Sequence, residues 1–328
     1  MASRIGITGQ LARELLKKFP DTPLRTLARI LYRDNPLDYN SYEHARSTLR
    51  LYAGKQGKDA RKRIKSNEYY RPMKYKLPES QKEDYTPYDL PVLANRVLIL
   101  SDTHIPYHDN DAITAALDYG KERKMNTILL NGDTIDCYSL SRFVKNPKMR
   151  HFDQELKDVE QFLDVLKTFN VKIYFKKGNH EERLETYLKI HAPELFGMKE
   201  FQLENLLHFG ARGIECISDQ RIVMIGKLPV LHGHEFQNKS QGVVNPARTL
   251  FTKGMKSAVV GHSHRTSIHT DSNLMSKIIT CWSSGCLCGL HPEYARINKW
   301  NHGAVFVERA RDGAFKVDNF RINEGKLL

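Results

Sequence analysis

In the first sixty residues the apolar side chains recur at the spacing of an α-helix. Pro23 suits the first turn of a helix, and Ser41 suits a helix cap. Three short helices are predicted, with apolar faces made by Leu11, Leu15, Leu16 and Phe19, then by Leu24, Leu27, Ala28 and Leu31, and then by Leu49 and Leu51. We therefore expect a small all-α domain over residues 1–65.

From Arg96 onward the pattern changes to short apolar runs that end in Asp, Asn or His. Runs of this length, rich in branched side chains, predict buried β-strands. Five of them lead into Asp102-Thr-His104, Gly132-Asp133, Gly178-Asn179-His180, His232-Gly-His234 and His262-Ser-His264. Such strands predict an α/β domain over residues 95–328.

Residues 66–94 carry tyrosines and prolines without an apolar period, which predicts a linker between the two domains. Its aromatic side chains suit anchors that hold the linker against the next domain. The alternative is stacking on a single nucleic-acid strand, because the tyrosines here alternate with Lys and Arg.

The composition excludes several classes of protein. No apolar run approaches the roughly 18 residues that a bilayer span needs. The N-terminus lacks the apolar segment of a secretory signal, and five cysteines are a sparse, odd set for a disulfide framework. We expect a soluble cytoplasmic protein with no membrane partner.

The net charge of +13 is concentrated in one part of the chain. Residues 1–76 hold 18 Lys and Arg against 7 Asp and Glu, and such a segment attracts a polyanion. Nucleic acid, DNA before RNA, is the expected partner, since the helix count and charge resemble a helix-turn-helix module. The alternative is a solvated helical face that binds nothing. The expected contacts come from Arg25, Arg29, Arg46, Arg50, Arg61, Lys62 and Arg63.

Each polar strand end is weak evidence by itself, because short motifs match by chance. Five of them in order indicate one shared site. Carboxylate oxygens and imidazole nitrogens bind divalent cations, so the pattern predicts a centre that holds two of them.

Together the blocks resemble the signature of the calcineurin-like metallophosphoesterases. The matching residues are Asp102-Thr-His104, Gly132-Asp133-Thr-Ile-Asp136, Gly178-Asn179-His180-Glu181, His232-Gly233 and Gly261-His262-Ser-His264. The resemblance covers about residues 95–310, and the basic preface and residues 285–303 look similar to bacteriophage-type members. It implies a four-layer α/β-β/α sandwich with the metals at one rim.

The resemblance also implies a role for each residue of the centre. One metal would be held by Asp102, His104 and His264, the other by Asn179, His232 and His262, with Asp133 bridging the two. The two ions are expected to be Mn2+, although the same ligands admit Fe, Zn or Mg. They would clamp a phosphate and acidify a water, so that hydroxide attacks the phosphorus.

Four further residues are expected around the metals. His180 resembles the family's histidine that stabilises or protonates the leaving oxygen, and Asp136 would orient His180 or another neighbour of the metals. Of the two histidines in the fourth block we choose His232 as ligand, so His234 would face the substrate. Lys177 would attract phosphate, with a solvated strand-end lysine as the alternative; for Lys176 the solvated lysine is preferred.

The segment after the last metal motif is rich in cysteine and aromatic residues. Cys281, Cys286 and Cys288 lack the spacing of zinc knuckles, so we expect core or loop thiols. We interpret Tyr294 and Trp300 as packing under a long loop, with base stacking as the alternative.

Three functions fit these observations. We expect a dinuclear metal-dependent nuclease or phosphodiesterase, because a basic module is joined to a hydrolase centre. The alternative is a phosphomonoesterase acting on a phosphoprotein or a nucleotide, and the third function is a nucleic-acid-binding regulator with a structural metal. A bacteriophage-type protein would act in the cytoplasm of its host.

Overall fold

The computed structural model describes residues 6–19, 22–55, 85–143, 151–217, 220–236 and 244–328. The chain divides into two compact units, Met1–Glu83 and Asp84–Leu328. Arg61, Lys62, Arg63 and residues 66–84 of the predicted linker lie outside the described residues. None of the described helices combines the length and the apolar character that crossing a bilayer requires.

The smaller unit contains the three predicted helices, α1 (Ile7–Lys18), α2 (Leu24–Asp34) and α3 (Tyr42–Tyr52). The Ser41 hydroxyl caps α3 by accepting a hydrogen bond from the amide of His44 at 3.1 Å, as predicted. Pro23 stands at the cap of α2, just before the first turn in which we expected it. The buried core consists of Ala12, Leu27, Ala28, Leu31, Tyr39, Ala45 and Leu49.

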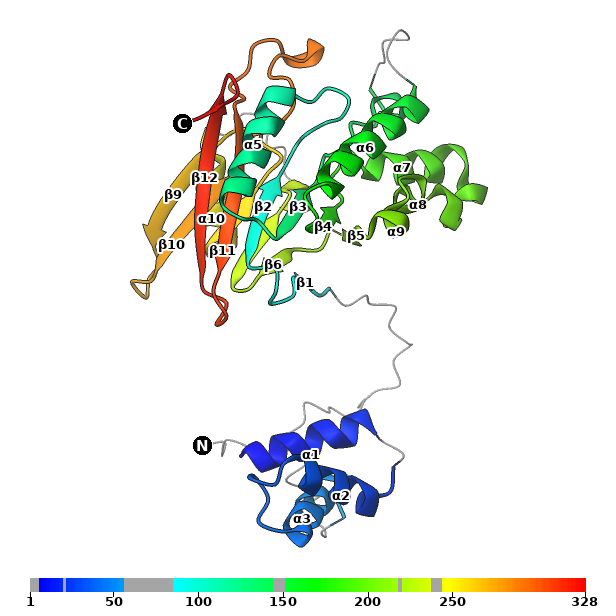
Figure 1. The fold of residues 1–328 in the computed structure, drawn as a ribbon, viewed down its shortest axis with the longest axis vertical. Helices are drawn as coiled ribbons and strands as arrows, with labels where there is room; N and C mark the ends of the chain where they lie inside the picture. The colour runs from blue at the N-terminus through cyan, green and yellow to red at the C-terminus, as the bar shows by residue number, and fades with distance from the viewer. Residues whose placement is uncertain (1–5, 20–21, 56–84, 144–150, 218–219, 237–243) are drawn as a thin grey trace, which may run out of the picture. The chain divides into compact units, whose positions relative to one another are not determined.

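The larger unit contains two β-sheets (Figure 1). The seven-stranded sheet has the order β13 (Lys326–Leu327), β12 (Phe315–Asn323), β11 (His302–Arg309), β2 (Arg96–Leu100), β3 (Thr127–Asn131), β4 (Lys172–Lys176) and β5 (Glu215–Ile217). The six-stranded sheet has the order β1 (Tyr88–Asp89), β6 (Val223–Ile225), β7 (Leu228–Leu231), β8 (Ala258–Val260), β10 (Ile278–Ser283) and β9 (Ser267–Ser272). β2 to β5 are mutually parallel, as are β7 and β8.

The larger unit begins earlier than the expected boundary at residue 95. β1 pairs in parallel with β6, and the Tyr85 hydroxyl accepts a hydrogen bond from the amide of Ile222 at 2.7 Å. The Tyr88 ring also lies 6.2 Å from the Tyr174 ring. These contacts agree with the anchor interpretation for the described end of the predicted linker.

Both faces of the central strands are buried, which explains their continuous apolar runs. On β2, Leu98 and Leu100 pack in the cluster under the helices, whereas Val97 and Ile99 pack between the sheets. The helices that cover the seven-stranded sheet include α5 (Asn110–Glu122), α6 (Phe152–Lys167) and α7 (Glu182–His191), followed by α8 (Leu203–Leu206) and α9 (Phe209–Arg212) (Figure 1). α10 (Pro246–Gly254) packs on the outer face of the six-stranded sheet. The predicted four-layer α/β-β/α sandwich is therefore confirmed.

Candidate metal centre

All seven predicted metal ligands follow the ends of five strands. β2, β3 and β4 are parallel neighbours, so the residues after them emerge at the same edge of the sheet. β7 and β8 are parallel neighbours in the other sheet and deliver the three remaining histidines. The two sheets therefore present their polar strand ends to one shared rim.

Five of these residues have a left-handed backbone. The φ angles are 57° at Asp102, 48° at His104, 53° at Asp133, 64° at His262 and 54° at His264. Residues other than glycine seldom adopt this conformation, although Asp and His tolerate it better than most. Such conformations gather where a surrounding structure holds side chains in place for a function.

In one half of the site, two histidines and an aspartate face one another. The Nε2 atoms of His104 and His264 are 3.2 Å apart, and Asp102 Oδ1 lies 3.2 Å from His264 Nε2. All three residues are buried, and they are the group predicted to hold the first metal. Among the predicted ligands, the donor atoms that lie mutually close form two sets, however: His104 and His264 group with Cys288, whereas Asp102 groups with Asp133, His232 and His262.

The other half is built around His232. Its Nε2 lies 3.2 Å from Asn179 Oδ1, and its ring centre lies 5.0 Å from that of His262. The Nδ1 atom of His232 is hydrogen bonded to the carbonyl of Asn131 at 2.8 Å, which leaves Nε2 facing the site. This is the group predicted to hold the second metal.

Asp133 lies between the two halves. Its Oδ2 is 3.9 Å from His104 Nε2 on one side and 3.3 Å from His232 Nε2 on the other. Its Oδ1 accepts a hydrogen bond from the amide of His180 at 2.9 Å, which fixes the carboxylate. The position agrees with that of a bridging ligand.

Two buried side-chain atoms with few or no protein partners indicate that these residues suit the binding of cations. His262 Nδ1 is buried without a hydrogen-bond partner among the described residues, and Asp102 Oδ1, also buried, has only its 3.2 Å contact with His264 Nε2. An unpartnered buried acceptor is costly, and a bound cation would satisfy it. Oxygen and imidazole donors of this kind suit Mn, Fe, Zn or Mg.

The charge states of two predicted ligands suit metal ligation, whereas two others must lose a proton when a metal binds. Burial acts to raise the pKa of Asp133, but His180 and His232 hold it well below the ordinary value. Burial and the charge of His232 lower the pKa of His262 to about 4. At neutral pH Asp133 is therefore a carboxylate and His262 a neutral imidazole, the forms that bind metals. Burial acts to lower the pKa values of His232 and His264, but the carboxylates of Asp133 and Asp102 raise them to about 10 and about 9.

Two glutamates that the sequence did not single out, the buried Glu181 and the half-buried Glu235, hold the loops of the centre. Glu181 accepts hydrogen bonds from the amides of Gly178 (2.7 Å), Asp133 (2.9 Å), Thr134 (2.7 Å) and Ile135 (3.2 Å). It thereby ties the end of β3 to the end of β4. The only signal for this role was its place within the Gly-Asn-His-Glu block.

Glu235 acts in the same way on the six-stranded sheet. It accepts hydrogen bonds from the amides of His232 at 3.0 Å and Gly233 at 2.5 Å. Lys176 Nζ pairs with Glu235 at 2.9 Å and is fully buried, so its interpretation as a solvated lysine was wrong. The pair joins the two sheets beneath the site.

Asp136 contacts two imidazoles of the centre. Its Oδ1 lies 3.0 Å from His104 Nδ1 and 3.0 Å from His180 Nδ1. An acceptor at Nδ1 fixes the ring orientation and directs Nε2 toward the metal position. Asp136 is thus placed to orient His180 and also the predicted ligand His104.

Arg183 is a further residue that the sequence did not indicate. Its guanidinium lies 2.8 Å from His180 Nε2 and donates to the carbonyl of Asp136 at 2.8 Å. It is half-buried in the first turn of α7, three residues after His180. A planar guanidinium at this position can bind phosphate oxygens in a bidentate manner.

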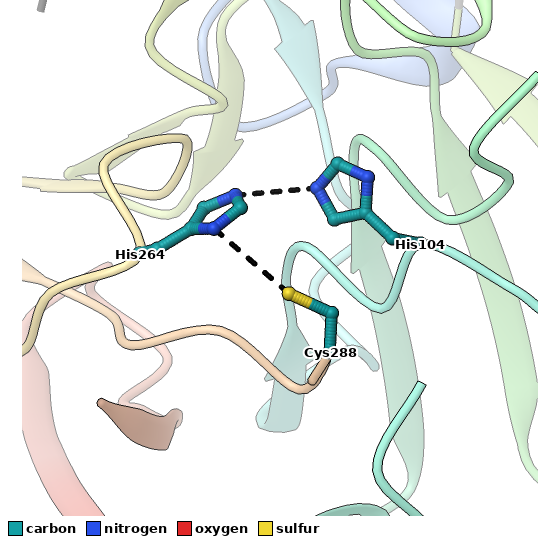
Figure 2. A group of neighbouring side chains, drawn as sticks. All are labelled: His104, His264 and Cys288. Atoms are coloured by element: carbon teal, nitrogen blue, oxygen red, sulfur yellow. Dashed lines mark hydrogen bonds between the residues drawn. The ribbon is translucent and has the colours of Figure 1, made fainter. Parts of the chain in front are cut away.

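Cys288 provides the third group around His264 (Figure 2). Its Sγ lies 3.9 Å from His264 Nδ1, while Nε2 of the same ring faces His104. Cys281, Cys286 and Cys288 are all buried free thiols, as expected of core residues. Cys288 in addition touches a predicted metal ligand.

The two predicted substrate-binding residues have protein partners instead. Lys177 Nζ pairs with Glu185 and Glu204, both at 3.2 Å, so it does not reach toward a phosphate as we expected. His234 Nε2 lies 3.0 Å from Glu182 Oε1, and its ring centre is 5.2 Å from that of His232. His234 therefore lies beside the centre, with its Nε2 bonded to Glu182 and not free for a substrate.

The predicted nucleic-acid contacts within the described residues lie on two helices. Arg25 and Arg29 are exposed one turn apart on α2. On α3, Arg50 is exposed, whereas Arg46 is half-buried and pairs with Glu43 at 3.1 Å. The basic groups therefore stand on the polar faces of the helices, as the spacing predicted.

The chain is similar to several known proteins. The family model described as calcineurin-like phosphoesterase matches residues 95–266. The Gene 54 proteins of Mycobacterium phages L5 and D29 are each 29% identical over 184 residues, which span 54% of this chain and 71% of each relative. Among solved structures, Vps29 of Cryptosporidium parvum has 14% identity and a TM-score of 0.39, covering 71% of this chain and 94% of that one. The phosphoesterase YfcE of E. coli has 15% identity and a TM-score of 0.32, covering 70% and 100%.

Proposed function

Since this chain belongs to the calcineurin-like phosphoesterase family, we propose that it is a nuclease, which hydrolyses phosphodiester bonds of nucleic acid with the help of two Mn2+ ions. Membership of the family makes it a metal-dependent phosphoester hydrolase; the proposal adds the substrate and the metal. The observation that carries it is the convergence of seven donor side chains from five strand ends on one buried rim.

The residues of the centre have distinct roles. Two divalent cations bound there would neutralise the phosphate and acidify a water for attack on phosphorus. Asp133 supplies the negative charge that two neighbouring cations must share. Glu181 and Glu235 hold the strand ends in register, so the donors are already in place before a substrate arrives.

His180 and Arg183 serve the reacting phosphate. Charge develops on the leaving oxygen as its bond to phosphorus breaks. In the structure His180 Nε2 accepts a hydrogen bond from Arg183, so His180 can stabilise or protonate that oxygen once the guanidinium turns toward the phosphate and Nε2 takes up a proton. The negative charge of Asp133, with the hydrogen bond that His180 Nδ1 donates to Asp136, raises the pKa of His180 despite its burial. Arg183 adds a fixed positive charge beside it.

The basic unit is the reason to choose nucleic acid as the substrate. Arg25, Arg29 and Arg50 give α2 and α3 exposed positive charge suited to a phosphate backbone. Its three helices fit a helix-turn-helix module, and we propose DNA before RNA as the polymer. The similarity to mycobacteriophage proteins fits a protein that works in the cytoplasm of an infected cell.

A panel of substrates tests the proposal. Wild type and Asp133→Asn, both stripped of metal and reloaded with Mn2+, are given single-stranded DNA, duplex DNA, RNA, a bis-aryl phosphodiester and an aryl phosphomonoester. We expect the wild type to cut DNA and the bis-aryl diester, and Asp133→Asn to lose about a hundredfold or more in rate. Activity confined to the monoester would overturn the nuclease proposal in favour of a phosphatase.

A further inference from the structure

Aromatic side chains gather beside the metal centre on the loop that follows β10. The Trp300 ring centre lies 4.1 Å from that of His264, and the Tyr294 ring centre lies 6.2 Å from that of Trp300. His264, Trp300 and Tyr294 thus form a continuous row of rings that starts at a predicted metal ligand and leads outward.

Tyr294 does not pack in a core. Its side chain is 76% exposed, whereas Trp300 is half-buried against His264. Packing under a long loop explains Trp300 but not Tyr294.

Polar contacts help to hold this loop in shape. His291 Nδ1 is hydrogen bonded to the carbonyl of Arg296 at 3.0 Å, and Asn298 Nδ2 donates to the carbonyl of Ala295 at 2.7 Å. The amide of Trp300 donates to Asn298 Oδ1 at 2.7 Å. A loop ordered in this way presents Tyr294 without needing it for stability.

A second pair of rings lies on the neighbouring loops. Tyr107 and Tyr138 have ring centres 6.3 Å apart and follow His104 and Asp136 closely in the chain. The amide of Gly289 donates to the carbonyl of Tyr107 at 2.8 Å, so the loop that carries Tyr107 runs beside the loop that leads to Tyr294. Aromatic side chains thus come from several loops that surround the centre.

We propose that Tyr294 and Trp300 form a stacking platform for an unpaired nucleobase next to the phosphate that is cleaved. This inference rests on the proposed function and names its substrate more closely. Every base has a π-face that stacks on Tyr or Trp, so such a platform is tolerant of sequence. A base within a duplex is covered by its neighbours, so the platform selects single strands and unpaired ends.

The first test measures binding without cleavage. Full-length protein in EDTA is titrated with a dinucleotide that contains 2-aminopurine, whose fluorescence falls when the base stacks. We expect wild type and Tyr294→Phe to quench the signal, and Tyr294→Ala to bind at least about fivefold more weakly. Ile297→Ala is the matched control, because Ile297 is 99% exposed on the same loop, and it should behave as wild type.

The second test separates the platform from the proposed function. Mn2+-loaded wild type and Tyr294→Ala are given a thymidine dinucleotide and the same diester with both bases replaced by hydrogen. We expect kcat/KM of Tyr294→Ala to fall about tenfold on the first diester and to stay within about twofold on the second. Equal activities of the two proteins on the thymidine dinucleotide would overturn the platform and leave the phosphodiesterase standing. Failure of the wild type to cut either diester would overturn the proposed function itself.

Discussion

At the scale of single residues, the centre depends on groups that never touch the substrate. Seven donors face one rim, and the carboxylates of Glu181 and Glu235 hold the backbone that carries them. The donors could be predicted because the types Asp, Asn and His at strand ends mark metal chemistry. Glu181, Glu235 and Lys176 could not, since their roles depend on partners that are distant in the sequence.

Replacing Glu181 tests this support. In Glu181→Gln the amide keeps one oxygen, but its NH2 group would face amides that themselves donate, such as those of Asp133 and Gly178. We expect the free energy of unfolding to fall by about 2–3 kcal/mol, measured by urea denaturation. Glu194→Gln, at an exposed position, should change it by less than about 0.5 kcal/mol. An unaltered stability of Glu181→Gln would show that the four hydrogen bonds contribute nothing.

Cys288 provides a second test at this scale. Its thiol lies against Nδ1 of His264, the nitrogen that faces away from His104. We expect Cys288→Ala to weaken Mn2+ binding about tenfold, because the ring loses a partner that orients it. Titration calorimetry on metal-free protein measures this, with Cys216→Ala as the control. Equal affinities of the two variants would mean that Cys288 is only a core residue.

At the scale of elements, the strands were the most predictable part of the fold. The interiors of β2 and β3 are continuous apolar runs because both of their faces are covered, and each strand ends where the polar block begins. The sequence could not indicate which loops meet at the rim beyond the metal motifs. The positions of Tyr294 and Arg183 beside the centre follow only from the fold. The ion pair between Lys177 and Glu185 likewise depends on the fold and could not be predicted from the sequence.

A buried glutamate on helix α6 predicts that the stability of the protein depends on pH. Glu155 on this helix is fully buried, and burial together with the charge of Asp136 raises its pKa to about 8. The folded protein therefore retains a proton that the unfolded chain releases above about pH 4.5, so stability falls as pH rises from about 4.5 to 8. We expect Glu155→Gln to reduce this slope and to be more stable than wild type at pH 8 by about 1–3 kcal/mol.

Urea denaturation between pH 5 and pH 9 measures the effect. Glu122→Gln, at an exposed position on α5, should follow the wild-type curve. If Glu155→Gln loses stability with pH as steeply as wild type, the slope comes from another group.

At the scale of the whole molecule, the chain joins a basic helical unit to a hydrolase unit. The uneven charge and the change from helical to strand-like patterning predicted both parts. The boundary was harder to predict, because β1 is a two-residue strand that gains its stability from pairing with β6. A pairing of this length leaves no periodic signal in the sequence.

The basic unit predicts a salt dependence. Replacing both Arg25 and Arg29 by Gln should weaken DNA binding and lower the slope of log affinity against log salt by about 2, one for each lost phosphate contact. Arg33→Gln is the matched control, because Arg33 lies on the same helix but pairs with Asp34 at 2.6 Å. Filter binding at several salt concentrations would measure the slopes. A slope unaffected by the double substitution would remove α2 from the nucleic-acid interface.

The most direct measurement is the number and coupling of Mn2+ ions bound by metal-free protein after reloading. Metal analysis combined with electron paramagnetic resonance should show two magnetically coupled ions per wild-type chain. Asp133→Asn should lose the coupling and retain fewer ions, because the carboxylate between His104 and His232 is gone. A single ion in the wild type, or two uncoupled ions that Asp133→Asn leaves unaltered, would contradict a dinuclear centre bridged by Asp133.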